Sequence, residues 1–126
     1  MKKQLLVLDD QESYVRAFAR SLRTDYEVIG ATTIAEAQKV ASPSFQAVLV
    51  DVRLSQTNSE DRQGLEFVKW LKRKYPDLLV IAMSALDDPD LPGEATAAGA
   101  ALFLMKPVRM TDLAKALGSV GSQAAR

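Results

Sequence analysis

Five short apolar runs alternate along the chain with segments that carry apolar residues at helical spacing, and this alternation constrains the fold more than any other feature. The runs are Leu5 to Leu8, Tyr26 to Ile29, Ala47 to Val50, Leu78 to Met83 and Ala101 to Met105. Four are continuous, which is typical of strands buried on both faces of a parallel sheet, whereas Glu27 marks the second as an edge strand. The pattern predicts one α/β domain: a five-stranded parallel sheet with helices on both faces.

The helical segments are predicted from their caps and breakers. Thr33 can cap the second helix, and the third begins after Gly64. The fourth is predicted to be short and mobile, from Glu94 to Ala98, because prolines and glycine precede it. Thr111 is predicted to cap the last helix. Glycines and serines follow it, so we place the domain at residues 1–120 and a C-terminal tail or linker stub at 121–126.

Charge and residue types narrow the possible functions. Sixteen basic and 16 acidic residues cancel, so no net field favours direct contact with nucleic acid or an anionic membrane. The chain has no Cys and no His, which leaves carboxylates, hydroxyls and amines for any chemistry. No apolar stretch is long enough for a signal peptide or a membrane span, so we expect a cytoplasmic protein.

Ionisable residues follow the predicted strands. Asp9 and Asp10 end the first, Asp51 ends the third, and Lys106 ends the fifth. The carboxyl ends of parallel strands share one edge of the sheet, where such folds bind ligands. Two unit charges about 4 Å apart repel by about 4 kcal/mol at an effective dielectric constant of about 20. The carboxylates therefore need a cation, and Mg²⁺ with its preference for oxygen ligands fits.

The motifs in this order resemble the receiver domain of bacterial two-component response regulators. They are LLVLDD, VLVDVRL, IAMSAL with Ser84, and LMKPV with Lys106 and Pro107. Each is weak alone, but four in register are specific. The resemblance covers residues 4 to about 118 and implies the flavodoxin-like strand order 2-1-3-4-5.

The resemblance implies a phosphorylation site. Asp51 would accept a phosphoryl group from a phosphohistidine. Mg²⁺ or Mn²⁺ would be held directly by Asp10 and largely through water by Asp9. Asp51 and the backbone carbonyl of Arg53 would be further ligands. Lys106 would pair with the acyl phosphate, and Pro107 would fix the adjoining turn through a peptide bond that is commonly cis in the family.

It also implies a switch. Ser84 would donate its hydroxyl to the phosphoryl group while Phe103 swings inward, which changes the surface of the fourth helix, fifth strand and fifth helix. Arg53 and Leu86 would tune dephosphorylation. Such a protein is a signalling switch that catalyses only its own phosphorylation and dephosphorylation. Its expected partners are a histidine kinase or histidine phosphotransfer protein, an unidentified output partner or effector domain, and a second copy through the switched surface.

Structural explanations compete with these roles. Asp9 or Asp10 could cap the following helix, Lys106 could be a solvated charge, Ser84 a turn residue and Phe103 a core residue. Only the occurrence of all these residues together favours a functional site over the separate structural explanations.

The segment after Asp51 departs from the family pattern. Family members have a short connection with proline and glycine, whereas Ser55 to Gln63 brings extra residues and no proline before Gly64. Glu60 and Asp61 are near enough to affect metal binding, although we expect neither to be a ligand. The departure leaves a second hypothesis open: a phosphorylation-independent pseudo-receiver that acts as a protein-interaction module.

Two enzyme classes are disfavoured. Haloacid-dehalogenase-type phosphatases need a second Asp two residues after the nucleophile, where Arg53 stands. A flavodoxin-type flavin site needs a hydroxyl- and glycine-rich loop after the first strand, where this chain has Asp9-Asp10-Gln11-Glu12.

Overall fold

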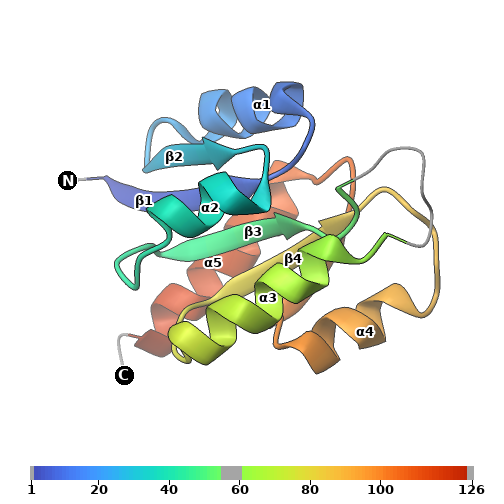
Figure 1. Ribbon diagram of the computed structural model, residues 1–126. Coiled ribbons are helices and arrows are strands. Elements are labelled where there is room, and N and C mark those ends of the chain that lie inside the picture. Colours follow the sequence, from blue (N-terminus) through green and yellow to red (C-terminus); the bar gives the residue numbers. More distant parts are fainter. Residues whose placement is uncertain (1, 55–60, 125–126) are drawn as a thin grey trace.

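The five strands form one parallel sheet in the order β2-β1-β3-β4-β5, as the resemblance implied. A computed structural model describes residues 2–54 and 61–124 of the protein (Figure 1). The strands are β1 (Lys3–Leu8), β2 (Tyr26–Ala31), β3 (Ala47–Asp51), β4 (Val80–Ser84) and β5 (Leu102–Met105). The helices are α1 (Glu12–Leu22), α2 (Ile34–Val40), α3 (Gln63–Lys74), α4 (Leu91–Ala98) and α5 (Met110–Ala124).

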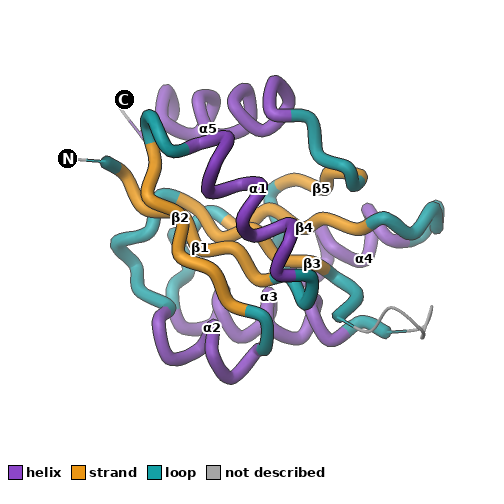
Figure 2. Tube along the Cα trace, turned by 90° about the horizontal axis from the view of Figure 1, so that it is seen from above, coloured by secondary structure: helices purple, strands orange, loops and turns teal. Residues whose placement is uncertain are grey.

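The helices cover both faces of the sheet. Figure 2 shows α1 and α5 on one side and α2, α3 and α4 on the other. Alternate residues of the central strands feed the two cores: Leu6, Val48 and Val50 face the α2/α3/α4 side, and Leu5, Val7 and Leu49 face the other. Every residue of β3 and β4 is buried, as their continuous apolar sequences predicted. These strands form a rigid support for the groups at their ends.

Several details differ from the sequence predictions. Residues Leu102 and Met105 of β5 are exposed because β5 is an edge strand. Helix α4 begins at Leu91, three residues earlier than predicted, because Pro92 lies in the first helical turn, where its missing N–H costs nothing. Gly99, with φ of 118°, ends the helix as expected.

Of the caps predicted for two other helices, one is confirmed and one is wrong. Thr33 does cap α2, since its side chain accepts a hydrogen bond from the N–H of Glu36. Thr111 does not precede α5 but lies inside it, because that helix begins at Met110. Helix α5 continues to Ala124, into the segment from residue 121 that was expected to be a tail.

Helix α3 begins directly against the backbone at the end of β3. A Cβ atom added to Gly64 would lie 2.1 Å from the carbonyl oxygen of Asp51 and 2.6 Å from the Cα of Val52. The N–H of Gly64 donates to the carbonyl oxygen of Val52 at 2.9 Å. Only a residue without a side chain allows this approach, so Gly64 sets how closely α3 supports Asp51.

Among the residues that the structure describes, no helix combines the length and the apolar character that crossing a bilayer requires.

Candidate functional site

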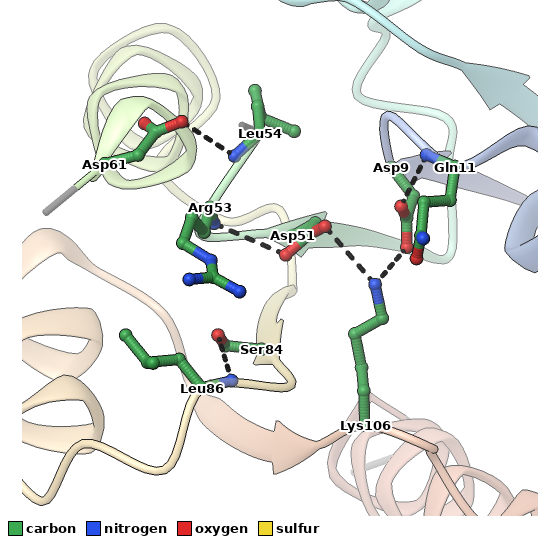
Figure 3. Close-up of polar contacts among 9 residues, drawn as sticks. All are labelled: Asp9, Gln11, Asp51, Arg53, Leu54, Asp61, Ser84, Leu86 and Lys106. Atoms are coloured by element: carbon green, nitrogen blue, oxygen red, sulfur yellow. Dashed lines mark hydrogen bonds and ion pairs between the residues drawn. The ribbon is translucent and has the colours of Figure 1, made fainter. Parts of the chain in front are cut away.

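The carboxyl ends of four strands bring the predicted site residues together. Asp51 and Ser84 are the last residues of β3 and β4, and Asp9 and Lys106 directly follow β1 and β5. Figure 3 shows the side chains of Asp9, Asp51 and Lys106 converging from separate elements, with Ser84 beside them. The sequence prediction that these residues share one edge of the sheet therefore agrees with the structure.

The Lys106 ammonium joins the two buried carboxylates. Its Nζ lies 2.7 Å from Oδ2 of Asp9 and 3.3 Å from Oδ2 of Asp51. The Lys106 side chain is 3% exposed, and those of Asp9 and Asp51 are 0% and 4% exposed. Lys106 is thus no solvated charge: in this low-dielectric setting a lysine and two carboxylates interact strongly.

Burial and charge act in opposite directions on these groups. Burial raises the pKa of Asp51 to about 7, because the positive charge and hydrogen bond of Lys106 oppose burial only in part and Asp9 adds repulsion. For Lys106, burial lowers the pKa, but its hydrogen bond to Asp9 and the charges of both carboxylates outweigh burial and raise it. The Lys106 ammonium therefore stays charged, whereas the Asp51 carboxyl group has a pKa close to neutral pH.

Three site side chains share one local arrangement: each accepts a hydrogen bond from the backbone N–H two residues later. Gln11 donates to Oδ1 of Asp9 at 2.9 Å, Arg53 to Oδ1 of Asp51 at 3.3 Å, and Leu86 to Oγ of Ser84 at 3.1 Å. Such local bonds to the backbone are common for Asp and Ser in turns and fix the side-chain direction. The alternative in which Asp9 caps α1 is wrong, because Gln11 is the residue that precedes this helix and no side chain caps it. One oxygen of Asp9 instead holds the turn before α1, while the other accepts from Lys106.

The carboxylates of Asp9, Asp10 and Asp51 can offer one oxygen each within 4.8 Å of one another. Asp10 is half-buried, and the other two are buried. Three ionised carboxylates and one ammonium leave a formal charge of −2 (−3 + 1), which a divalent cation would balance. Clustered hard oxygen donors suit Mg²⁺ or Mn²⁺. The residues present therefore fit the metal that the resemblance implied.

A pocket of about 20 Å³ opens at this point. Its lining consists of Gln11, Asp51, Arg53, Ser84, Ala85 and Lys106. This volume holds about one water molecule. A larger hollow of about 550 Å³, lined in part by Pro43 and Tyr75, lies at the opposite ends of the strands and contains none of the predicted site residues.

The remaining predicted residues lie around this centre. Phe103 and Leu86 are partly buried and pack against the core on the α2/α3/α4 side. The peptide bond between Lys106 and Pro107 is cis. In this conformation Phe103 therefore lies against the core without being fully buried in it.

The end of the long segment after β3 attaches to its surroundings through Asp61 and Arg62. The buried Asp61 carboxylate accepts hydrogen bonds from the N–H groups of Leu54, at 3.1 Å, and Gln63, at 2.8 Å. It therefore ties both sides of the segment together and is not part of the carboxylate cluster. Ser55 to Glu60, and with them the expectation for Glu60, lie outside the described residues.

Arg62 extends this attachment to the next loop. Its guanidinium donates to the carboxylates of Asp88, at 3.1 Å, and Glu94, at 3.4 Å, and so links the start of α3 to α4. The sequence prediction assigned nothing to Arg62, and it missed Tyr14, whose ring centroid lies 3.9 Å from Nζ of Lys106. The one available signal for Tyr14 was its place in the first turn of the helix that follows Asp10.

Comparison with known proteins agrees with this geometry. The sequence model of the family described as "Response regulator receiver domain" matches residues 5–118. The photosynthetic apparatus regulatory protein RegA of Rhodovulum sulfidophilum is 33% identical over 120 residues, which cover 93% of this chain and 62% of RegA. The chain thus spans about three fifths of that relative's length.

Two further proteins match over most of this chain. The chemotaxis protein CheY of Thermotoga maritima is 28% identical over 126 residues, covering 95% of this chain and 98% of CheY. A crystal structure of a response regulator protein from Burkholderia pseudomallei, described with a phosphorylated aspartic acid, calcium ion and citrate, has a TM-score of 0.77 and 26% identity. That match covers 98% of this chain and 74% of the other.

Proposed function

Because this chain belongs to the response regulator receiver domain family of two-component signalling, we propose that it accepts a phosphoryl group on Asp51 in a Mg²⁺-dependent reaction. The donor would be a phosphohistidine on a histidine kinase or a histidine phosphotransfer protein. The observation that carries the proposal is the buried arrangement in which Lys106 joins Asp51 to Asp9 at the carboxyl edge of the sheet. The phosphorylated aspartic acid described for the Burkholderia protein supports it.

The proposed reaction is carboxylate nucleophilic catalysis. An ionised Asp51 oxygen attacks the phosphorus of the phosphohistidine, a P–O bond forms, and the P–N bond breaks. The electron pair of that bond leaves with the imidazole of the donor protein, and Asp51 becomes an aspartyl phosphate. The N–H of Arg53 and the ammonium of Lys106 fix the direction of the Asp51 carboxylate before the attack.

Lys106 and Ser84 are the groups of this chain that we assign to the phosphoryl oxygens. Lys106 already lies 3.3 Å from the acceptor carboxylate, so its ammonium can pair with a phosphoryl oxygen there. Ser84 Oγ accepts a hydrogen bond from Leu86 and keeps its own hydroxyl proton available to donate. Both groups compensate negative charge that increases at Asp51.

For the metal, we propose the side chains of Asp9, Asp10 and Asp51 and the backbone carbonyl of Arg53 as ligands. A bound Mg²⁺ or Mn²⁺ would offset the negative charges of the acceptor and of the phosphoryl group. The calcium ion in the description of the Burkholderia structure supports a divalent cation at such a site.

Signalling would follow from a change around Ser84. A Ser84 hydroxyl that turns toward the phosphoryl group would draw the loop before α4 inward and let Phe103 change its packing. The altered surface would comprise α4, β5 and α5, where Leu102 and Met105 are exposed, 40% and 46% respectively. We propose that an output partner, an effector domain or a second copy binds there, and that Arg53 and Leu86 set the dephosphorylation rate. We place the receiver domain at residues 1–120.

The test is labelling with acetyl phosphate and Mg²⁺, followed by intact-mass measurement. We expect one phosphoryl group per chain in the wild type, none in Asp51→Asn, and none after chelation of the metal. An unlabelled wild type, or a label that persists in Asp51→Asn, contradicts the proposal. If the wild type stays unlabelled and both proteins bind the same partner equally well, the pseudo-receiver hypothesis is favoured instead.

A further inference from the structure

The ammonium of Lys106 has a third neighbour that the proposed reaction does not use. Besides the carboxylates of Asp9 and Asp51, its Nζ lies 3.9 Å from the centroid of the Tyr14 ring. Tyr14 belongs to α1, so the contact adds another element to the site. The Lys106 side chain is only 3% exposed, which leaves water little access to its charge.

Such a contact is attractive for a physical reason. The face of an aromatic ring carries partial negative charge, and a cation within about 6 Å of the ring centroid is drawn to it, most strongly where both groups are desolvated. The Lys106 contact is well inside that limit. Unlike the two carboxylates, a ring face attracts the ammonium without prescribing one hydrogen-bond direction.

We propose that Tyr14 is a positioning residue, which holds the Lys106 ammonium at the acceptor carboxylate through its ring face. This inference rests on the proposed function, in which Lys106 pairs with a phosphoryl oxygen on Asp51. During that reaction the ammonium must exchange part of its bonding to the carboxylates for the new oxygens. The ring of Tyr14 keeps its attraction while those partners change, so the flexible lysine stem stays in place.

A purely structural role for Tyr14 is the competing explanation. Tyr14 is partly buried and packs against the core that contains Leu5, Phe18 and Leu113. Tyr14→Phe keeps the ring, whereas Tyr14→Leu keeps an apolar side chain and removes the ring face. Tyr26→Leu is a matched control, because Tyr26 packs against the same core from β2 and has no described contact with Lys106.

The first readout needs no phosphorylation. Protons above an aromatic ring are shifted upfield in NMR spectra, so the ε-methylene protons of Lys106 should be shifted in the wild type and in Tyr14→Phe. The shift should disappear in Tyr14→Leu and remain in Tyr26→Leu. The loss of one lysine signal in Lys106→Arg assigns the resonance. Wild-type Lys106 signals at the position of ordinary exposed lysines overturn the proposal, whether or not Tyr14→Leu folds.

The second readout is the rate of labelling by acetyl phosphate with Mg²⁺. Its acyl phosphate P–O bond breaks as Asp51 attacks phosphorus, and acetate leaves with the electron pair. We expect Tyr14→Leu to be slower by about tenfold, a typical effect of losing a desolvated cation–π contact. Tyr14→Phe should restore the rate, and Tyr26→Leu should keep it. Circular dichroism verifies that each variant is folded.

The outcomes separate this inference from the proposed function. A wild type that takes no label refutes the proposed function itself. A wild type that is labelled while folded Tyr14→Leu reacts at the same rate refutes only the role of Tyr14. Equal slowing in Tyr14→Leu and Tyr26→Leu also refutes it, because the effect would then come from lost packing.

Discussion

The carboxyl group of Asp51 must be ionised to act as the proposed acceptor, yet its burial raises its pKa to about 7. Protons and a divalent cation therefore compete for the same oxygens near neutral pH. We expect the Mg²⁺ affinity to increase as the pH rises from about 6 to about 8 and then to level off, because Asp51 is ionised above its pKa. Calorimetric titration with MgCl₂ across this range measures the dependence.

Asp51→Asn is the control for that titration, because it removes the titrating group and keeps the size of the side chain. Its weaker Mg²⁺ binding should lack the rise near pH 7. An affinity that is constant over this range in the wild type contradicts the assignment. The same pKa shift reduces stability at high pH: the folded state holds the Asp51 proton more tightly than the unfolded state, so its contribution is present at acidic pH and lost as the pH rises through about 7.

At the scale of elements, the contact of α3 with β3 depends on Gly64. In Gly64→Ala the new methyl group would meet the backbone of Asp51 and Val52, which cannot rotate away as a side chain could. We expect a loss of about 1–3 kcal/mol in the free energy of unfolding, as for other overpacked sites, and slower labelling of Asp51. Urea unfolding and the acetyl phosphate assay measure the two effects.

Gly93→Ala in α4 is the matched substitution, since a Cβ there meets nothing within 4 Å. A helical glycine replaced by alanine in open space should stabilise the protein by about 0.5–1 kcal/mol. If Gly64→Ala behaved like Gly93→Ala, the close approach of α3 to the acceptor strand would be wrong.

Arg62 couples α3 to α4 through Asp88 and Glu94. These ion pairs are partly exposed, so Arg62→Ala should cost only about 0.5–1 kcal/mol in overall stability. Its local effect should be larger, because Asp88 also accepts a hydrogen bond from the N–H of Asp90 just before α4. We expect faster amide hydrogen exchange in the first turn of α4, measured by mass spectrometry.

The comparison for this variant is Lys69→Ala, which removes an exposed pair with Glu66 within α3. Amide hydrogen exchange in α4 should not change in this control variant. Unchanged exchange in Arg62→Ala as well would mean that Arg62 does not restrain α4.

The sequence was sufficient to predict those helices and strands whose local residue pattern agrees with the way they pack in the folded protein. The continuous apolar strands and the polar residues at their ends predicted the order of elements and the cluster of Asp9, Asp51 and Lys106. Tyr14 was missed because a contact between a helix and a lysine 92 positions later (106 − 14) leaves no local pattern. The early start of α4 was missed because Pro92 was interpreted as a breaker, although it is favourable in a first turn.

At the scale of the whole molecule, Lys106 compensates two charges that lie far before it in the sequence. It pairs with Asp9, 97 residues away, and with Asp51, 55 residues away. Lys106→Met would leave two buried carboxylates without their cation, which typically costs about 3–5 kcal/mol. Thermal unfolding should show a lower Tm, and Mg²⁺ should raise the Tm of this variant more than that of the wild type.

The exposed Lys39 provides the control for this prediction, because Lys39→Met removes the same charge from the surface of α2. Its Tm and its response to Mg²⁺ should match those of the wild type. A Lys106→Met protein as stable as Lys39→Met would show that the buried ammonium does not hold the sheet edge together.

The late position of Lys106 also bears on how the protein is made. A ribosome releases Asp9 first and Asp51 next, and the lysine that pairs with both emerges only after the last strand of the sheet. Until then the growing chain carries acidic groups that repel one another where the sheet must close. The site is therefore completed only when the last strand of this sheet has emerged, and a product truncated before Lys106 would leave the carboxylates of Asp9 and Asp51 without the ammonium that joins them.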